Sequence, residues 1–314
     1  IDELYKKFSL SVDFKQLKKD IHKSIEDIVS TSDDRLEKYN NNEIIIIGSP
    51  GKLKNRVLAM NGYAKDSKVI GVLHGEESGA VSSSSWQYDD RSLSQVLIGY
   101  GKYGDFSFNP DPKMQSLDGC RQKYIQSNSD SIKKIYSSND INDLNLNKRN
   151  KGLYISWKMN NTSVINADDV LDLIEYYNWQ KYLLNQYSNI EIKVHPKQEN
   201  YFKYDCKIIE KNLEECIKNY DYFVIDYISS TAFALIAATN KPIIYYNIGL
   251  SKFTMLGDKL IKERVISCDV NIHKNYEGFC LFNKNEEVKN YNYTKYFSLA
   301  DNNKSRINAL FDIL

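Results

Sequence analysis

The chain has 314 residues, enough for two α/β domains that each close a hydrophobic core. Its 42 basic and 41 acidic side chains nearly balance, so no overall field points to nucleic acid or to an anionic membrane. The longest apolar run, Ile44–Ile47 with its neighbours, is far shorter than the roughly 20 residues of a membrane span. These features predict a soluble protein, or one that associates with a membrane only peripherally.

Cysteine usage bears on the cellular compartment. The five cysteines are scattered, with no Cys-x-x-Cys pair and no histidine at ligand spacing. Because nothing at the N-terminus resembles a signal peptide, we predict reduced thiols in a cytoplasmic protein. Any membrane association is expected at the inner face of the cytoplasmic membrane. The cysteines are Cys120, Cys206, Cys216, Cys268 and Cys280.

The first half of the chain alternates predicted helices and strands. Apolar residues recur at three- and four-residue intervals before the first strand, which is typical of an amphipathic helix. That strand, a run of isoleucines, reads as buried on both faces by helices. The sequence then turns polar after residue 111, with one helical stretch. The predicted elements are strands at 43–47, 68–74 and 95–99, and helices at 13–39, 54–65 and 120–136.

The second half repeats this alternation. We place the domain boundary near residues 148–151, giving an N-terminal domain of residues 1–150 and a C-terminal domain of residues 151–314. Alternating strands and helices predict parallel sheets whose ligands lie at the carboxyl ends of the strands. The C-terminal third is expected to be helical at its end and otherwise irregular. The predicted elements are strands at 152–157, 190–195, 222–226 and 242–246, and helices at 167–187 and 231–239.

Two short motifs follow predicted strands of the second half. His195-Pro196-Lys197 ends one strand, and Asp226-Tyr-Ile-Ser229-Ser230-Thr231 ends another and opens a helix. Taken singly, the first is typical of a turn and the second of a helix N-cap. Together, at the ends of what we take to be neighbouring strands, they indicate a phosphate-binding site of hydroxyls and backbone N–H groups.

These motifs, with an alanine-rich helix and Lys241-Pro242-Ile-Ile-Tyr after them, resemble the C-terminal domain of the CDP-glycerol glycerophosphotransferases that polymerise teichoic acids and capsules. The His-Pro and Ser-Ser pair also resembles the motifs of bacterial sialyltransferases, polysialyltransferases and Kdo transferases, which use CMP-activated sugars. The resemblance covers roughly residues 150–250 and extends only loosely to the N-terminal half. It implies a GT-B fold, in which two Rossmann-like parallel-sheet domains face a cleft.

The resemblance also implies roles for individual residues. The C-terminal domain would bind the nucleotide donor, and His195 would contact its phosphate or cytidine and help the nucleotide to leave. A departing phosphate gains negative charge, which preorganised donors stabilise by several kcal/mol. The residues expected to bind the donor are His195, Pro196, Lys197, Asp226, Ser229, Ser230 and Thr231.

A transferase also needs a base that takes the proton of the acceptor hydroxyl. His74, Glu76 and Glu77 follow a predicted strand of the N-terminal, acceptor-side domain, and the sequence leaves open which of them acts. His74-Gly75 is similar to a His-Gly of the teichoic-acid polymerases, and the two glutamates resemble an acidic pair of sialyltransferases. Because no Asp-x-Asp follows a strand, we predict chemistry without a metal and without a cofactor.

Several functions are compatible with these motifs. Teichoic-acid enzymes continue the Ser-Ser helix with an aspartate that this chain lacks, which favours a CMP-activated nonulosonate, sialic-acid-like or Kdo donor and an inverting transfer to a cell-surface glycan or glycolipid. CDP-glycerol or CDP-ribitol transfer is the first alternative. A non-catalytic nucleotide- or glycan-binding module of a larger assembly is the second, favoured by a chain that begins at Ile1 without methionine. A UDP-sugar epimerase is a minor further option.

Overall fold

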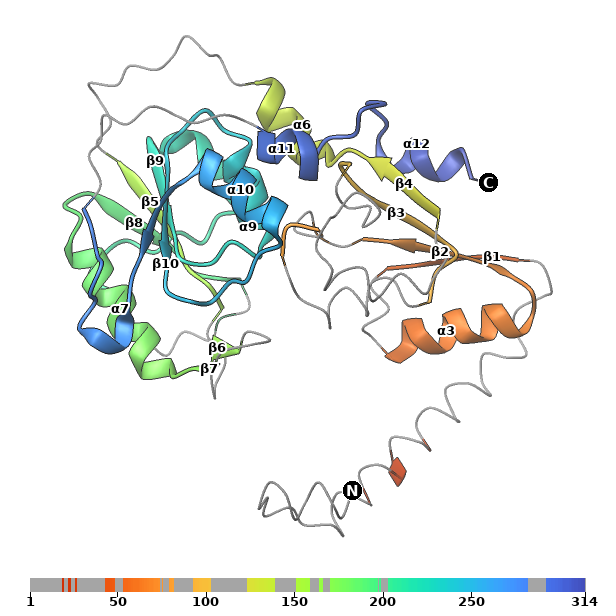
Figure 1. The fold of residues 1–314 in the computed structure, drawn as a ribbon, viewed down its shortest axis with the longest axis horizontal. Helices are drawn as coiled ribbons and strands as arrows, with labels where there is room; N and C mark the ends of the chain where they lie inside the picture. The colour runs from red at the N-terminus through yellow and green to blue at the C-terminus, as the bar shows by residue number, and fades with distance from the viewer. Residues whose placement is uncertain are drawn as a thin grey trace.

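The computed structural model describes ten ranges of the chain and six single positions. The ranges are 43–48, 53–73, 79–81, 93–102, 123–138, 151–158, 164–165, 170–196, 203–281 and 292–313; the single positions are 19, 22, 23, 26, 75 and 198. These residues form two parallel β-sheets with helices packed against them (Figure 1). The prediction of an α/β fold with two parallel sheets is therefore confirmed.

The first sheet has four parallel strands in the order β1-β2-β3-β4. Figure 1 shows helix α3 lying along one face of this sheet. The strands are β1 (Ile44–Ile47), β2 (Lys68–Val72), β3 (Val96–Tyr100) and β4 (Lys123–Ser127), and α3 spans Leu53–Ala64.

The helix predicted at 120–136 is wrong in its first part, where the structure has strand β4 and then helix α6 (Asp130–Ser137). Strand β4 pairs with β3, and the Tyr124 ring crosses close over Gly99. A Cβ at Gly99 would lie 2.5 Å from the Tyr124 hydroxyl, so only glycine permits this approach. Residues 123–127 form a strand because they pair with β3, and the spacing of apolar residues in the sequence does not show this pairing.

The second sheet has five parallel strands in the order β11-β10-β9-β5-β8. The chain passes from β5 outwards to β8 and then returns to β9 on the other side of β5. The strand order therefore reverses between β5 and β9, which defines a topological switch point. The strands are β5 (Gly152–Ile155), β8 (Ile190–Lys193), β9 (Tyr222–Ile225), β10 (Ile243–Asn247) and β11 (Ile266–Asp269), and a small hairpin is formed by β6 (Val164–Ile165) and β7 (Val170–Leu171).

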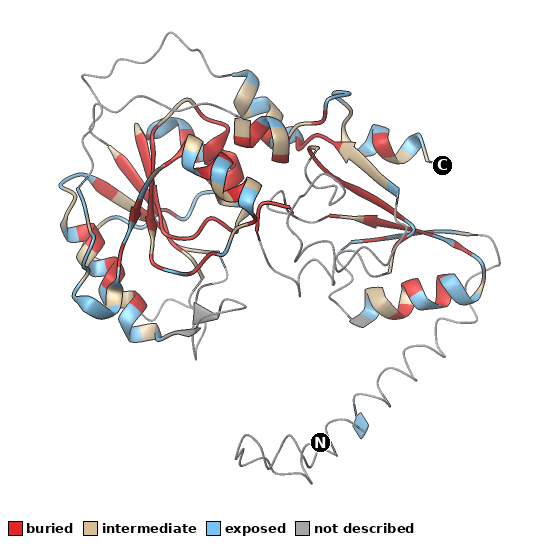
Figure 2. Cartoon of the chain, in the orientation of Figure 1, coloured by how far each residue is buried: buried red, intermediate tan, exposed pale blue. Residues whose placement is uncertain are grey.

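Both faces of the second sheet are covered, and its strands are buried (Figure 2). One face packs on α9 (Thr231–Ala237) and α10 (Met255–Arg264) through apolar residues such as Phe233 and Leu260. The other packs on α7 (Leu173–Asn185) through an aromatic cluster that includes Tyr176 and Trp179. This double coverage accounts for the continuous apolar runs in the sequence.

Strand β1 differs from that pattern. Ile45 and Ile47 pack on the α3 side, whereas Ile44 and Ile46 are 41% and 46% exposed. The expectation that this strand is buried on both faces is therefore wrong. Four consecutive isoleucines gave no alternation from which an exposed face could be recognised.

The C-terminal third is more regular than predicted, because α10 and β11 complete the second unit. Arg264, at the end of α10, is 1% exposed. Its guanidinium donates hydrogen bonds to the carbonyls of Ala237, Thr239 and Lys241. It therefore closes the C-terminal end of α9, where cations are favoured.

The last helix returns to the first sheet. The described ranges also contain the short α8 (Leu213–Cys216), α11 (Asn292–Phe297) and α12 (Arg306–Phe311). Ala309 packs in one apolar cluster with Ile70 and Val96, and the Arg306 guanidinium donates to the Leu73 carbonyl. Helix α12 therefore packs on the first sheet, although it follows the second sheet in the chain. The domain boundary at 150/151 stays a prediction.

The expectation of five reduced thiols is wrong for one pair. Cys268 and Cys280 form a disulfide that ties the end of β11 to the segment that follows it. Their separation of 12 residues matches no motif, so only the fold brings them together. Cys206 and Cys216 are free thiols, and Cys120 lies outside the described residues.

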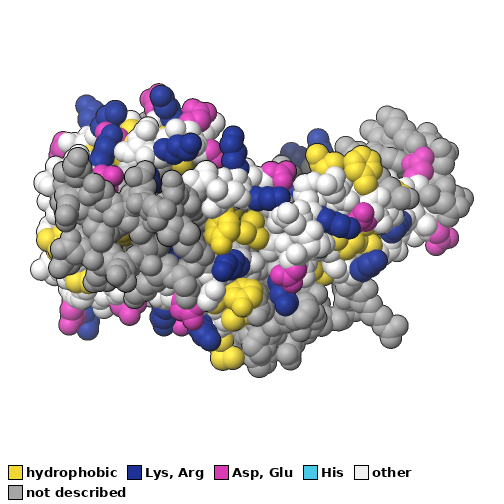
Figure 3. Space-filling model, turned by 90° about the horizontal axis from the view of Figure 1, so that it is seen from above, with side chains coloured by type: hydrophobic (Ala, Val, Ile, Leu, Met, Phe, Trp, Pro, Cys, Tyr) yellow, Lys and Arg dark blue, Asp and Glu magenta, His cyan; other side chains and the backbone are white. Residues whose placement is uncertain are grey.

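The surface and the helices bear on membrane contact. Figure 3 shows basic and acidic side chains interspersed over the described part of the face seen from above. None of the described helices combines the length and the hydropathy that a bilayer crossing requires.

Candidate functional site

A cavity of about 450 Å³ lies where β5, β8 and β9 end. The segments that line it follow these strands directly: residues 155–157 after β5, 193–196 after β8, and 229–232 after β9. Residues 212–214 also line it, and Asn212 and Glu214 supply polar side chains. The cavity therefore occupies the switch point of the second sheet, which is where open parallel sheets bind ligands.

The structure brings together most of the described residues that were predicted to bind the donor. His195, Pro196, Ser229, Ser230 and Thr231 all line this cavity. The sequence analysis took strands β8 and β9 to be neighbours, but β5 lies between them. The two motifs therefore face each other across the end of β5, and this strand contributes residues of its own.

Several predicted residues lie outside the described part of the chain. These are Lys197 of the donor motif and the three base candidates, His74, Glu76 and Glu77. Their roles stay predictions.

Ser229 and Ser230 have different roles although they are adjacent. The Ser230 hydroxyl accepts a hydrogen bond from the Phe233 N–H and caps α9, so it is used by the fold. Ser229 is 3% exposed, and its hydroxyl has no hydrogen-bond partner in the structure. A buried hydroxyl without a partner costs free energy, so a site that keeps one is suited to a ligand that would satisfy it.

Lys193 is a cation in the wall of the cavity that the sequence analysis missed. It is 8% exposed, and its ammonium group donates to the Lys211 carbonyl at 2.6 Å. An ammonium group has three donors. Lys193 is the last residue of β8, where a lysine is ordinarily exposed, and only its contact with the 211–214 segment shows that it is buried.

An aromatic wall, made of Trp157 and Tyr227, forms another side of the cavity. The two rings stack with centroids 3.7 Å apart. The imidazole of His195 meets Trp157 edge-on at 5.7 Å. Trp157 and Tyr227 were also missed, because an aromatic at a strand end is ordinarily a core residue. A flat apolar surface of this kind can receive a nucleobase.

Asp226 does not line the cavity, so the expectation that it contacts the donor directly is wrong. It is fully buried on the α7 side of the sheet, and its carboxylate accepts hydrogen bonds from Tyr154, Tyr176 and Trp179 at 2.5, 3.1 and 3.0 Å. Burial raises the pKa of Asp226 to about 6, although these hydrogen bonds oppose the shift. The Tyr176 hydroxyl also accepts a hydrogen bond from the backbone N–H of Trp157 at 2.9 Å, which links Asp226 to the aromatic wall.

Lys241, part of the motif that carried the resemblance, serves the fold. Its ammonium group donates to the carbonyls of Ile217 and Lys218 at 2.9 and 3.1 Å. It lies at the start of β10, away from the strand ends that form the cavity. The resemblance therefore mixes site residues with residues that secure the sheet.

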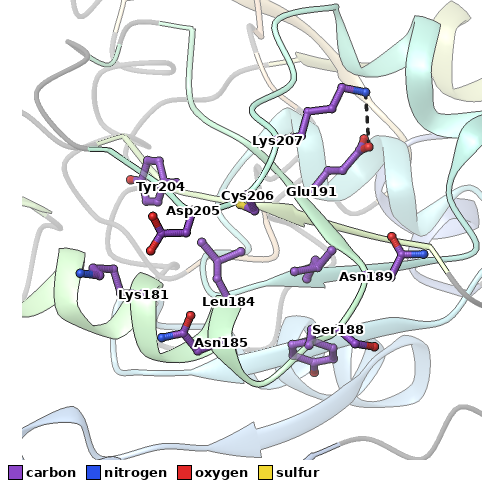
Figure 4. Close-up of a pocket in the computed structure, with 12 residues that line it drawn as sticks. Lys181, Leu184, Asn185, Ser188, Asn189, Glu191, Tyr204, Asp205, Cys206 and Lys207 are labelled. Atoms are coloured by element: carbon purple, nitrogen blue, oxygen red, sulfur yellow. Dashed lines mark hydrogen bonds and ion pairs between the residues drawn. The ribbon is translucent and has the colours of Figure 1, made fainter.

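A second cavity, of about 480 Å³, lies at the amino end of β8 (Figure 4). In its wall, Glu191 forms ion pairs with Lys151 at 3.0 Å and Lys207 at 3.3 Å, and it accepts a hydrogen bond from Tyr220. Figure 4 shows Lys207 and Glu191 joined at one side of the cavity, with Asp205 and Lys181 on the other. This cavity is of similar size, and its Glu191 carboxylate is already paired within the protein.

Metal binding has no visible site in the described ranges. There, no group of three His, Cys, Asp or Glu side chains is arranged so that it could hold a metal ion. Metal-independent chemistry stays a prediction, because the base candidates are not among these residues.

Comparisons with known proteins give little further information. No protein-family model matches the chain, and no curated protein matches it. Among solved structures, the wall teichoic acid polymerase TagF is similar with a TM-score of 0.28 and 9% identity, over 76% of this chain and 80% of that chain. A likeness this weak carries no weight for function, which has to be inferred from the cavity itself.

Proposed function

We propose that the chain is a GT-B-type glycosyltransferase that binds a CMP-activated sugar in the cavity at the ends of β5, β8 and β9. One observation carries this proposal: the cavity lies at the switch point and contains the buried, unpartnered hydroxyl of Ser229. The CMP-sugar identity of the donor is inferred from the His195-Pro196 and Ser229-Ser230 motifs.

The cavity offers a separate environment for each part of a nucleotide. The Trp157–Tyr227 wall suits a pyrimidine, because base–aromatic stacking contributes about 1–3 kcal/mol per base. Ser229 and the ammonium group of Lys193 suit a phosphate, since charge-assisted hydrogen bonds to anions are the strongest kind. Both environments lie within one cavity of about 450 Å³, in the size range of small-ligand sites.

The reaction follows from this placement. The acceptor oxygen attacks the anomeric carbon of the donor while the bond from that carbon to the phosphate oxygen breaks, and CMP leaves with the electron pair. His195, Ser229 and Lys193 would stabilise the charge that develops on the phosphate. The acceptor proton passes to His74, Glu76 or Glu77, and attack opposite the leaving group inverts the anomeric centre.

Polyol-phosphate transfer from CDP-glycerol or CDP-ribitol would use the same cavity, with the acceptor attacking phosphorus instead of carbon. The motif resemblance to CDP-glycerol enzymes favours this alternative. Incubation with each donor separates the two: slow hydrolysis of the first gives CMP and free sugar, and of the second CMP and a phosphopolyol.

The proposal is tested by thermal-shift titration with CMP, CDP, UMP, UDP and GDP, because a ligand that binds only the native state raises the melting temperature. We expect the largest shift with cytidine nucleotides and its loss in His195→Ala. His273→Ala is the matched control, since His273 is an exposed histidine paired with Glu175. A preference for uridine, or no shift in the wild type, would contradict the proposal. Cytidine binding without turnover of either donor class would favour a non-catalytic binding module.

A further inference from the structure

Residues 79–81 of the N-terminal half are held directly against residues 253–257 of the C-terminal half, and we call this contact the clasp. Val81 forms an antiparallel bridge with Phe253. The Thr254 N–H donates to the Ala80 carbonyl at 3.1 Å, and the Thr254 hydroxyl donates to the Gly79 carbonyl at 2.9 Å. Figure 1 shows the corresponding orange segment beside α9 and α10.

The clasp is closely packed as well as hydrogen-bonded. Ala80 is fully buried and belongs to the same apolar cluster as residues of α9 and α10. Gly257, in the first turn of α10, lets the chain approach: a Cβ there would lie 2.2 Å from the Ala80 carbonyl oxygen. Because that oxygen belongs to the backbone, a side chain at 257 would force the segments apart.

The clasp is also connected to the candidate donor site. The Ile228 N–H donates to the Ser251 hydroxyl at 3.4 Å, and Ile228 directly precedes Ser229. Ser251 is three residues from Thr254, and both are buried. A short continuous path therefore runs from the loop that carries Ser229 to residues 79–81.

Residues 79–81 follow the base candidates closely in the chain. Glu77 precedes Gly79 by two residues, and His74 precedes it by five. The clasp thus fixes the position of residues 79–81, which directly follow these candidates in the sequence.

We propose that Thr254 and Gly257 are positioning residues, which hold residues 79–81 against residues 253–257 so that a ligand in the donor cavity also slows hydrogen exchange at residues 79–81. This inference rests on the proposed function, because it takes the cavity to be the donor site. Thr254 acts through the Gly79 and Ala80 carbonyls, and Gly257 acts by leaving room for them. Neither residue lines the cavity.

The test is hydrogen–deuterium exchange of the full chain with and without CMP, for wild type and Gly257→Ala. In the wild type, CMP should slow exchange at residues 225–232 and also, through the clasp, at 79–81 and 253–257. In Gly257→Ala, we expect CMP to bind within about threefold of the wild-type affinity and to slow exchange at 225–232 only. The same CMP protection of 79–81 in both proteins would overturn the proposal.

Thermal stability gives a second reading that needs no ligand. Alanine in place of glycine ordinarily stabilises a helix. If Gly257 did not contact Ala80, Gly257→Ala would therefore melt at a higher temperature than the wild type. We expect it to melt lower, with at least tenfold faster exchange of the Thr254 amide. A higher melting temperature of Gly257→Ala with unchanged exchange of the Thr254 amide would show that the clasp does not hold these segments together, whether or not CMP binds.

Thr254 variants guard against a general folding defect. Because the Thr254 hydroxyl also caps α10 by accepting from the Gly257 N–H, Thr254→Ser should keep both hydrogen bonds and the CMP-linked protection of 79–81. Thr254→Val should lose that protection, and its retention would overturn the proposal. If CMP does not bind the wild type, the proposed function fails. The melting temperature and the ligand-free exchange of Gly257→Ala would still show whether the clasp holds the two segments together.

Discussion

The two ends of strand β8 carry cavities of similar size and different character. At the carboxyl end, a cavity of about 450 Å³ holds the unpartnered Ser229 hydroxyl and the aromatic wall. At the amino end, a cavity of about 480 Å³ has Glu191 in its wall, and the protein already pairs this carboxylate with two lysines and a tyrosine. Volume therefore does not identify the binding site. Unsatisfied bonding capacity at a switch point is the better guide.

The largest expected effect comes from removing the carboxylate beneath the carboxyl-end cavity. Asp226→Ala would leave the donors of Tyr154, Tyr176 and Trp179 buried without an acceptor, so we expect a loss of about 3–5 kcal/mol in the free energy of unfolding. Urea denaturation measures this loss. Asp205→Ala at the amino-end cavity is the matched control and should change stability by less than about 0.5 kcal/mol. Equal losses in the two variants would contradict the comparison.

The carboxyl groups next to the two cavities, Asp226 and Glu191, should change the stability of the protein with pH in opposite directions. The pKa of Asp226 is raised from 3.8 to about 6, chiefly by burial, so between these values the native state holds a proton that the unfolded chain has lost. Stability should therefore fall as pH rises from about 4 to about 6, by up to about 3 kcal/mol, because one pKa unit corresponds to about 1.4 kcal/mol.

Glu191 should behave in the opposite way. Burial raises its pKa, but hydrogen bonds from Tyr220, Lys151 and Lys207 outweigh burial and leave the pKa lowered. Its contribution to stability is present above its unfolded pKa and is lost as pH falls through its folded pKa. Denaturation of Asp226→Asn and Glu191→Gln across pH 3–7 checks both directions. Retention of the wild-type slope between pH 4 and 6 in Asp226→Asn would refute the assignment.

The aromatic wall should determine nucleotide affinity. Trp157→Leu removes the stacking surface, and we expect CMP affinity to fall about 10- to 30-fold, or about 1.4–2 kcal/mol. Trp157→Phe keeps an aromatic face and should retain most of the affinity. Isothermal titration calorimetry measures both, and an unchanged dissociation constant for Trp157→Leu would remove the base from this wall.

The smallest effect is also the most specific to a ligand site. Ser229→Ala removes a buried hydroxyl without a partner, so stability should stay constant or rise by up to about 1 kcal/mol, while CMP affinity falls about tenfold. Ser188→Ala, at the amino-end cavity, should change neither quantity. Lower stability of Ser229→Ala with unchanged affinity would assign this serine to the fold.

The sequence predicted the second sheet and much of its site for a physical reason. Strands buried on both faces appear as continuous apolar runs, and the residues after them are set at one edge of a parallel sheet. His195 and Ser229 could therefore be placed at one site from the sequence alone. Arg264 and the Cys268–Cys280 disulfide could not be predicted, because their partners come from distant segments.

The missed site residues have a related explanation. Lys193 and Trp157 end strands, and their residue types are common at the surface and in the core, respectively. Asp226 was misplaced because alternation along β9 turns its side chain to the α7 face, beneath the cavity. A motif shows which residues are near a site, and side-chain alternation decides which of them face it.

A crystal structure of the protein with CMP tests the central claim most directly. We predict CMP in the cavity at the ends of β5, β8 and β9, with its base against Trp157 and its phosphate within hydrogen-bond distance of the Ser229 hydroxyl and the Lys193 ammonium group. CMP at the amino-end cavity around Glu191, or an empty carboxyl-end cavity at saturating CMP, would contradict the account.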